Sequence, residues 1–455
     1  MYTSIGFYND RGWTLADDVK RITANIKNSF YWKEDKIKAT ISAQGNLRNQ
    51  NSPGTLSQRK NTVIGTFERD FDINPFAYAL GTSRTLRPRN ANGEPEYYRN
   101  NWAPFNILNE FDNNYLKTEV LDFKLQGELS YRLNENIEAK GLASVRHAVT
   151  KSSHFITEQS NVIQAFRANE TPYVAQENIY LLKNKDNPLQ LPQVALIHGG
   201  MFNKTETSLR SYLGRFALDY NKQMGEHDIR AFGFTEIRYA DRIINPFQGY
   251  GIQYDRGNQV FTNPLIFDKL TNEGNTYFSL TERYERGVTL SASATYGYAG
   301  KYVFNGVFNY EGSNTAGKYS RSRWLPTWNI GAKWNMDQEK FMKKYPAVSK
   351  LALRASYGLT AKMNEQAINS TAVFKHLIIN RTLLKDRENA LHILHLENRD
   401  LTWEKMYELN LGLELGLFNN RISATFDVYQ RSSFDLIDLI RTSGVGGQYY
   451  KYANF

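Results

Sequence analysis

Apolar and polar side chains alternate with a two-residue period in segment after segment of this chain. In 121–133, every second residue from Leu121 through Leu125 to Leu133 is apolar or a glycine, and the residues between them are polar. Because a β-strand sends successive side chains to opposite faces, the pattern predicts one apolar and one polar face. The segment is about as long as a strand that crosses a bilayer, roughly 9–11 residues. Repeated alternation of this kind is typical of a transmembrane β-barrel.

The same alternation recurs along the rest of the sequence and predicts roughly a dozen strands, bounded by turn residues. The further alternating segments fall at about 22–32, 37–47, 137–145, 212–220, 229–239, 288–298, 302–310, 351–359, 409–417 and 422–428.

The connections between these segments are of two kinds. Short turns are predicted at Asn134-Glu135-Asn136, Ala299-Gly300 and Asn419-Asn420, because such residues favour tight hairpins. Long connections are predicted at about 48–118, 150–205, 240–277 and 360–400. Long structureless loops are uncommon inside a compact soluble domain, whereas short turns on one side and long loops on the other are expected of an outer-membrane barrel.

Composition is compatible with a barrel and excludes a helical membrane protein. Hydrophobic residues make up 41% of the 455 residues, and the mean hydropathy is −0.57. A barrel tolerates this value because only every second strand residue faces lipid. The chain is rich in aromatic residues, with 7 Trp, 29 Tyr and 26 Phe. Tyr and Trp favour membrane interfaces, and their rings also stack on sugars.

Cysteine content, charge and the N-terminal residues narrow the interpretation further. The chain has no Cys, so it has no disulfide framework and no thiolate site. Its net charge of +10 is dispersed rather than gathered in a stripe, so nucleic acid is not an expected partner. Residues 1–4 lack the basic start and apolar core of a signal peptide. An outer-membrane protein needs one, so either the barrel interpretation is wrong or this chain lacks its true start.

Specific stretches of sequence carry a family resemblance. RGWTLADDVKRITANIKNSFYW at 11–32 resembles an early barrel segment, and LTWEKMYELNLGLELGLFNN at 401–420 resembles a late hairpin with its turn. These and the segments at 69–86, 101–133 and 301–336 resemble SusC/RagA-family TonB-dependent outer-membrane transporters. The similar segments keep the family's order and span nearly the whole chain.

The resemblance implies an all-β fold, an antiparallel transmembrane β-barrel with long extracellular loops. Family barrels are of the 22-stranded class, and residues 1–455 would supply only part of one. The family's signal peptide, carboxypeptidase-regulatory-like domain, TonB box, plug and last strands are expected to be absent. A barrel with missing strands exposes two edges, which a membrane does not tolerate. We therefore expect 1–455 alone neither to close nor to transport.

The resemblance also implies a function for the intact protein in the outer membrane. It would import oligosaccharides, or peptides, together with a SusD-like surface lipoprotein. Energy would come from the TonB–ExbB–ExbD complex through the missing plug and TonB box. No bond is made or broken, so an enzyme and a cofactor are not expected. The polar strand residues Lys124, Glu128 and Arg132 would line the interior and hold the plug.

The strongest candidate binding site is the aromatic loop at 95–105. Tyr97, Tyr98 and Trp102 could stack on sugar rings, and Arg99 could hydrogen-bond to hydroxyls, because ligand sites combine apolar faces with a few polar groups. The alternative is that these side chains pack the loop onto its neighbours or onto a lid partner.

Other candidate chemistry is weak. The sequence has neither a G-x-S-x-G elbow nor a Walker A loop. His392 and His395 lack a clear third ligand, and a zinc site requires three or four protein ligands. An exposed loop or short strand is the favoured interpretation of this pair, and no metal site is predicted. Three further features favour structural roles: a glycine-rich loop at 443–447, a membrane-interface pair at Trp324 and Trp328, and a solvated loop rather than a calcium site at 112–114.

Two rival interpretations remain open. A soluble all-β carbohydrate-processing enzyme would have strands nearer the usual length of about 5–6 residues. A non-transporting outer-membrane barrel, such as an adhesin or a porin, would share the strand pattern but not the import machinery.

Overall fold

The protein is built around one large antiparallel sheet. The computed structural model describes residues 1–12, 15–34, 36–54, 56–60, 67–71, 73–184, 187, 189–314, 323–362, 373–380, 387–396, 401–444 and 449–455. Within them the main sheet contains 14 strands. They are β1 (Tyr2–Arg11), β2 (Asp18–Trp32), β3 (Ile37–Pro53), β8 (Asn114–Arg132), β9 (Ile137–Ile156), β10 (Gly200–Met224), β11 (His227–Gln253), β12 (Gln259–Val260), β13 (Thr281–Tyr298), β14 (Tyr302–Ser313), β15 (Trp324–Asn335), β16 (Val348–Lys362), β19 (Glu404–Leu417) and β20 (Ile422–Phe434).

Smaller elements lie in the connections. Four two-stranded hairpins are formed by β4 (Leu56–Lys60) with β5 (Phe67–Phe71), β6 (Tyr98–Asn100) with β7 (Ala103–Phe105), β17 (Val373–Asn380) with β18 (Arg387–His395), and β21 (Ile437–Arg441) with β22 (Tyr450–Asn454). The helices are α1 (Pro75–Gly81), α2 (Ile107–Asn113), α3 (Asn161–Ala165), α4 (Pro172–Glu177) and α5 (Leu265–Glu273), with short 3₁₀ turns η1 (Tyr254–Arg256), η3 (Met336–Gln338) and η4 (Lys340–Lys344).

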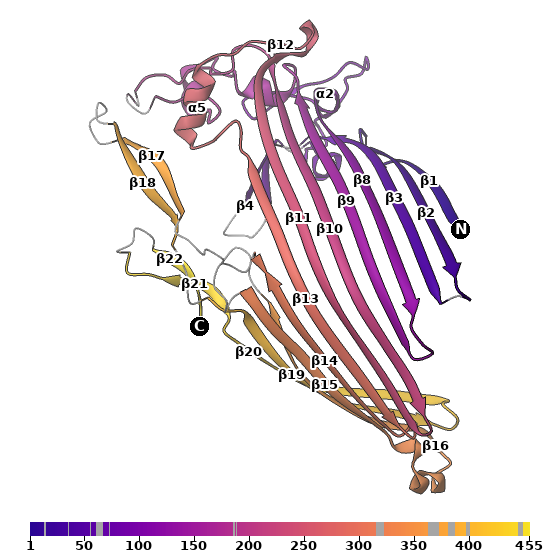
Figure 1. The fold of residues 1–455 in the computed structure, drawn as a ribbon. Coiled ribbons are helices and arrows are strands. Elements are labelled where there is room, and N and C mark those ends of the chain that lie inside the picture. The colour runs from indigo at the N-terminus through magenta and orange to yellow at the C-terminus, as the bar shows by residue number, and fades with distance from the viewer. Residues whose placement is uncertain are drawn as a thin grey trace.

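The main sheet is an up-and-down meander, and it confirms the predicted all-β antiparallel fold. Its long strands pair in sequence order from β1 to β20, with the small hairpins skipped. One end carries the short connections and the other carries α2, α5 and β12, as Figure 1 shows. The predicted tight turns are confirmed: Asn134 Oδ1 accepts the backbone N–H groups of Asn136 and Ile137, both at 2.9 Å. At the β19–β20 turn, Asn419 and Asn420 have positive φ angles of 58° and 60°, which Asn tolerates well.

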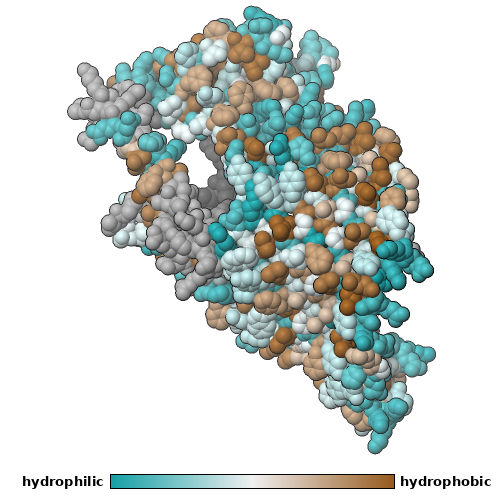
Figure 2. Space-filling model, viewed as in Figure 1, coloured by the Kyte–Doolittle hydropathy of each residue, from teal (hydrophilic) through white to brown (hydrophobic). Residues whose placement is uncertain are grey.

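The two faces of the sheet differ in chemistry. On one face the register aligns Leu125, Val145, Tyr212 and Tyr239 across β8, β9, β10 and β11. The first three of these side chains are 44–47% exposed, and similar rows continue to β20. Figure 2 shows hydrophobic residues gathered over the middle of the sheet, with a more hydrophilic end at the short turns. An exposed apolar surface of this extent is suited to hydrocarbon rather than water.

The opposite face is polar, and we call these two surfaces the apolar face and the polar face. Lys124, Gln126 and Glu128 alternate with the apolar residues of β8, and Arg146 faces Lys124 from β9. A barrel turns such a face to its interior. None of the helices in the described residues is long and apolar enough to cross a membrane.

Several strands are longer than the sequence predicted. The segments 150–205 and 240–277 were expected to be loops, but β9 runs to Ile156, β10 begins at Gly200 and β11 runs to Gln253. β10 has 25 residues and β11 has 27, well above the roughly 9–11 needed to cross a bilayer. Beyond the apolar band both faces mix apolar and polar residues, so the strands continue without the alternation that marks them in sequence.

The long connections are also not structureless. We call residues 54–113, 157–199 and 254–280 the loop layer. One hydrophobic core combines side chains from all three connections and from the ends of β9 and β10: Ala103, Ile156, Val162, Ile163, Ala165, Ala195, Leu196, Met201 and Ile266. A second core within the first connection contains Ile73, Phe105, Ile107 and Phe111. The loop layer is therefore a packed structure at one end of the sheet.

Buried asparagines tie the irregular backbone of the loop layer together. Asn106 caps α2 with Oδ1, and its Nδ2 donates to two carbonyl oxygens at 2.7 and 2.8 Å. Asn161 Nδ2 donates to the carbonyl oxygens of Asn100, Ala103 and Pro104 at 2.8–3.1 Å. Asn178 Nδ2 reaches two further carbonyls at 2.8 Å. Each amide satisfies backbone groups that would otherwise be buried without a partner.

Glu110 is the one carboxylate of the described residues that lies almost wholly inside the loop layer. Its side chain is in α2, the residue is 1% exposed, and Oε1 accepts the backbone N–H of Asn161 at 2.8 Å. Oε2 and Asn161 Oδ1 are buried without a hydrogen-bond partner among the described residues. Burial raises the pKa of Glu110 to about 7, because the charged form loses its hydration.

We expect the loop layer to lose stability as pH rises. The unfolded chain releases the Glu110 proton near its ordinary pKa of 4.5, whereas the folded state keeps it to about 7. The folded state therefore binds the extra proton between these values, and its advantage falls by about 3 kcal/mol across the window. Glu110→Gln should remove this dependence and protect the loop layer at pH 8. Hydrogen exchange of the α2 and α3 amides at pH 5 and pH 8 measures it.

Glu170→Gln is the matched control for this experiment, because Glu170 is exposed and its ion pair with Arg99 contributes little to stability. An equal change in exchange for both variants would contradict the assignment to Glu110.

A lysine introduced on the apolar face should affect stability differently from a lysine introduced on the polar face. Ala292 lies on the apolar face of β13 and Ser293 on the polar face. Ala292→Lys should cost about 2–4 kcal/mol in a bilayer, because a Lys at mid-depth faces hydrocarbon, and Ser293→Lys should cost much less. Urea unfolding of the intact protein in lipid vesicles measures both. Equal destabilisation by the two variants would show that the apolar face is not in lipid.

Candidate functional site

The predicted binding loop forms the β6–β7 hairpin. Tyr98 pairs with Phe105 and Asn100 with Ala103, and the two turn residues Asn101 and Trp102 have φ angles of 49° and 66°. Positive φ at both central residues is the backbone of a type I′ turn, which suits the twist of a two-residue hairpin. Trp102 lies at the tip of this hairpin, and it is half-buried.

The four predicted residues do not share one face of the hairpin. Tyr98 is half-buried, and its ring centroid is 5.3 Å from that of Phe105 in the second core of the loop layer. Burial raises the pKa of the Tyr98 hydroxyl. Tyr97 and Arg99, its neighbours in sequence, are exposed. Tyr98 thus packs the hairpin onto the loop layer, whereas Tyr97 and Arg99 remain accessible to a ligand.

Arg99 has a partner that the sequence did not indicate. Its Nη2 lies 3.1 Å from Glu170 Oε2, and both side chains are about 60% exposed. Glu170 belongs to the second connection of the loop layer, 71 residues away in sequence. The pair holds the Arg99 side chain over the surface, and an exposed pair of this kind exchanges easily for a ligand's hydroxyl or carboxylate.

The polar face carries an ion-pair ladder across β10, β11 and β14. Glu236 is 6% exposed and contacts the guanidinium groups of both Arg215 and Arg238. Arg238 also pairs with Glu311 on β14. The carboxylate that is almost fully buried therefore has two cationic partners, which offsets the cost of removing it from water.

A second network joins β15, β16, β19 and β20. Glu414 Oε2 lies 3.1 Å from Lys333 Nζ and 2.7 Å from Lys350 Nζ. Arg354 lies 3.6 Å from Glu414 and pairs with Asp427 at 2.6 Å. These pairs cross neighbouring strands and leave a wall that is charged but locally compensated.

The three residues predicted to line the interior, Lys124, Glu128 and Arg132, all belong to the polar-face set of β8. Lys124 and Glu128 line a hollow of about 460 Å³ together with Lys27 and neutral polar side chains. Within the described part of the chain, no ion pair joins either lysine to a carboxylate. This hollow suits a polar occupant, whether solvent or a protein segment.

The weaker candidates have structural settings. His392 and His395 lie on the short strand β18, and no group of three or more metal-ligating side chains occurs among the described residues. In 112–114, Asn113 Oδ1 accepts the Thr157 hydroxyl at 2.5 Å, and Asn114 lies against His154. Trp324 stacks on Tyr310 with ring centroids 5.1 Å apart, and Trp328 packs beside Tyr357. In the predicted loop 443–447, residues 445–447 lie outside the described residues.

Sequence reasoning missed the residues that organise the loop layer. Glu110 and Asn161 meet although 51 residues separate them. Arg167 donates to the carbonyl oxygens of Leu196 and Gly199, at 2.9 and 2.6 Å. A sequence signal comes from the single asparagines before α1 and α2 and from the hydroxyl residues before α3 and α4, since such residues favour helix N-caps.

Comparison with known proteins agrees with this architecture. A family model described as TonB dependent receptor-like, beta-barrel matches residues 57–455. The TonB-dependent receptor SusC of Bacteroides thetaiotaomicron is 27% identical over 451 residues, which cover 96% of this chain and 40% of SusC. The TonB-dependent receptor P3 of Formosa agariphila is 28% identical over 250 residues, which cover 54% of this chain and 23% of that protein.

Solved structures give the same fold. The structure of the RagAB peptide transporter superposes with a TM-score of 0.68 at 18% identity, covering all of this chain and 45% of that one. The RagAB importer in its open-open state gives 0.69 at 17% identity, covering all of this chain and 44% of that one. The chain spans 23–40% of the length of the curated relatives it matches. The family model covers most of this sequence, and the chain therefore belongs to the TonB-dependent receptor-like β-barrel family.

Proposed function

We propose that the intact protein imports oligosaccharides or peptides across the outer membrane as a SusC/RagA-type TonB-dependent transporter. The single observation that carries this proposal is the division of one continuous sheet into an exposed apolar face and an ion-paired polar face. Such a sheet is stable when hydrocarbon covers one side and a polar filling covers the other. A SusD-like surface lipoprotein and the TonB–ExbB–ExbD complex are the proposed partners.

The loop layer supports a role in capturing solutes. Its three connections share one hydrophobic core, so the exposed residues above it are presented on a fixed scaffold. Tyr97 and Arg99 on the β6–β7 hairpin supply an aromatic ring and a hydrogen-bond donor to a sugar or a peptide. A preformed surface binds with less loss of conformational freedom than a mobile loop does.

The rival functions fit the geometry less well. A soluble enzyme would have to keep the exposed leucines, tyrosines and phenylalanines of the apolar face in water, which favours aggregation. An adhesin or a porin would share the sheet. Neither would need energy from the inner membrane, and this difference allows an experiment to separate them from an importer.

Uptake measurements test the proposal directly. Cells should accumulate a fluorescent oligosaccharide or peptide only when the intact gene is present. They should lose this uptake when TonB is deleted or when a protonophore is added, because import against the closed barrel needs energy. A deletion strain complemented with the intact gene is the control. Unchanged uptake in both the gene deletion and the TonB deletion would reject the importer and leave an adhesin or a porin.

Substitutions in the hairpin test the binding site. Tyr97→Ala and Arg99→Ala in the intact complex should each weaken substrate binding about fivefold, because one ring contact or one hydrogen bond is worth about 1 kcal/mol. The same loss is expected for Trp102→Ala. Titration calorimetry with the transported substrate measures the affinity.

Tyr98→Ala is the matched comparison, because its ring packs inside the loop layer. It should increase proteolysis of the hairpin. If Tyr97, Arg99 and Trp102 could all be replaced without loss of affinity, the hairpin would not be the binding site.

A further inference from the structure

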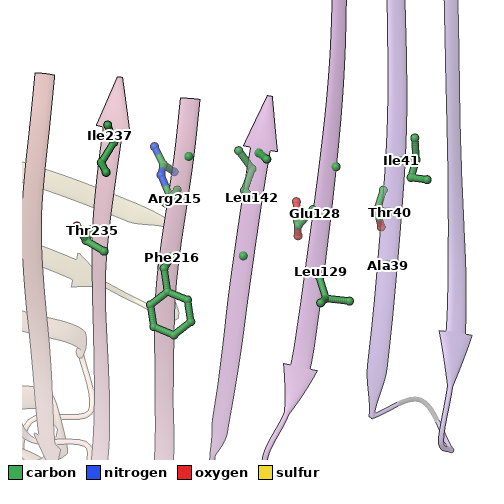
Figure 3. Close-up of a pocket in the computed structure, with 14 residues that line it drawn as sticks. Ala39, Thr40, Ile41, Glu128, Leu129, Leu142, Arg215, Phe216, Thr235 and Ile237 are labelled. Carbon is green, nitrogen blue, oxygen red and sulfur yellow. The ribbon is translucent and has the colours of Figure 1, made fainter. Parts of the chain in front are cut away.

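A shallow groove crosses the apolar face over β3, β8, β9, β10 and β11. It encloses about 660 Å³. The register aligns Ile41, Gly127, Ala143, Gly214 and Ile237 in one row, so that three small residues form its floor between two isoleucines. Large side chains two residues further along the same strands border it, as Figure 3 shows for Leu129 on β8 and Phe216 on β10.

The glycines that line this groove are not explained by the packing of the sheet. A Cβ added at Gly127, Gly141 or Gly214 would meet no atom within 4 Å, and none of the three has a positive φ. Glycine weakens a strand interior, and where neither a turn nor a tight neighbour requires it, it marks a place where another group approaches the backbone. The groove therefore has the character of a site kept open for an apolar occupant.

Two basic side chains lie beside the groove, toward the loop layer. Arg210 on β10 and His147 on β9 are direct register partners on the apolar face. Within the described part of the chain neither has an ion-pair or hydrogen-bond partner. Arg210 is exposed, and the carboxylate nearest to it in register, Asp241, is already paired with Arg286 at 3.0 Å. The guanidinium and the imidazole are thus available to an anion.

The distance between the groove and the two basic side chains restricts the kind of ligand that could contact both. Gly214 and Ala143 lie four residues from Arg210 and His147 along the same strands, which is roughly 13 Å. The ligand must carry an anionic group at one level of the bilayer and an acyl chain about that far below it. Guanidinium groups bind phosphate strongly, and basic side chains on a lipid-facing surface bind the anionic headgroups of lipids.

We propose that this groove binds a phosphorylated, acylated glycolipid of the outer leaflet, of the lipid A type. The phosphate pairs with Arg210 and His147, and one acyl chain covers Gly127, Ala143 and Gly214. The leaflet follows from the orientation in the proposed function, with the loop layer outside the cell. The groove itself depends only on the apolar face and on the side chains of Arg210 and His147.

Two kinds of variant test the site from its two ends in the intact protein. The double variant Arg210→Gln with His147→Gln removes the anion partners, and Gly214→Leu fills the groove without changing charge. The matched controls are Lys20→Gln, an exposed cation on the apolar face of β2, and Gly306→Leu on β14, where a Cβ also meets open space. Protein extracted from native membranes in mild detergent is analysed by native mass spectrometry for bound lipid A and phospholipid.

The proposal predicts at least a fivefold loss of bound lipid A for both test variants and no change for the controls. Retention of lipid A by the double variant overturns it. Phospholipid in place of lipid A overturns the choice of lipid and of leaflet. A dimer that dissociates on Gly214→Leu, with lipid unchanged, makes the groove an interface between two copies and also overturns the proposal. Uptake by the unmutated protein is measured separately, so a failure of the importer is distinguished from a failure of the lipid site.

Discussion

The structure depends on one constraint, the requirement that every strand keep its apolar residues on the same face as its neighbours. A shift of one residue in any pairing would carry a whole row of side chains to the other face. The rows from Leu125 through Val145 and Tyr212 to Tyr239 hold across four strands without interruption. Because lipid covers one face and polar groups fill the other, a slip would bury charges in hydrocarbon and expose leucines to a polar interior. The strand register is therefore fixed by the contrast between the hydrocarbon outside and the polar interior, rather than by a hydrophobic core within the sheet.

The ion pairs of the polar face reinforce the same register. Arg215 with Glu236 joins β10 to β11, and Arg354 with Asp427 joins β16 to β20 across β19. Each pair forms in only one alignment of its strands. The charges on the polar face therefore favour the same register that the apolar residues favour on the lipid-facing side. Glu236 is the clearest case, because an almost fully buried carboxylate is costly unless its cations are in place. These pairs specify the alignment more than they add to net stability.

The alternation in sequence was sufficient to predict the strands wherever the two faces differ, as in 121–133 and 288–298. It failed where they do not. The outer parts of β10 and β11 leave the apolar band, both faces there mix apolar and polar residues, and residues 240–253 therefore resembled a loop. The first strand, β1, has serine and glycine between its apolar residues and gave too weak a pattern.

The helices of the loop layer are five to nine residues long, which is too short for a helical period to be recognised in the sequence. The segment predicted to bind a ligand forms the β6–β7 hairpin, and its role in binding stays a prediction. The sequence could not separate Tyr98, which packs inward, from Tyr97 and Arg99, because strand pairing within a loop is not visible in composition.

The loop layer explains how long connections can act as one surface. In a chain without such a core, each connection would order itself separately on binding, at an entropic cost that grows with the number of residues fixed. Here Ala103, Val162 and Ile266 come from three connections and share one core. Asn161 donates its amide to carbonyls of the first connection while its backbone N–H binds Glu110. Gly199 allows the second connection to approach β11 closely, because an added Cβ there would lie 2.1 Å from the carbonyl carbon of Gly251. Gly251 allows β11 to approach the third connection, because an added Cβ there would lie 1.9 Å from the carbonyl oxygen of Phe261. A displacement of any one connection therefore strains the other two. A displacement of the β6–β7 hairpin therefore acts on the whole layer rather than on one connection alone.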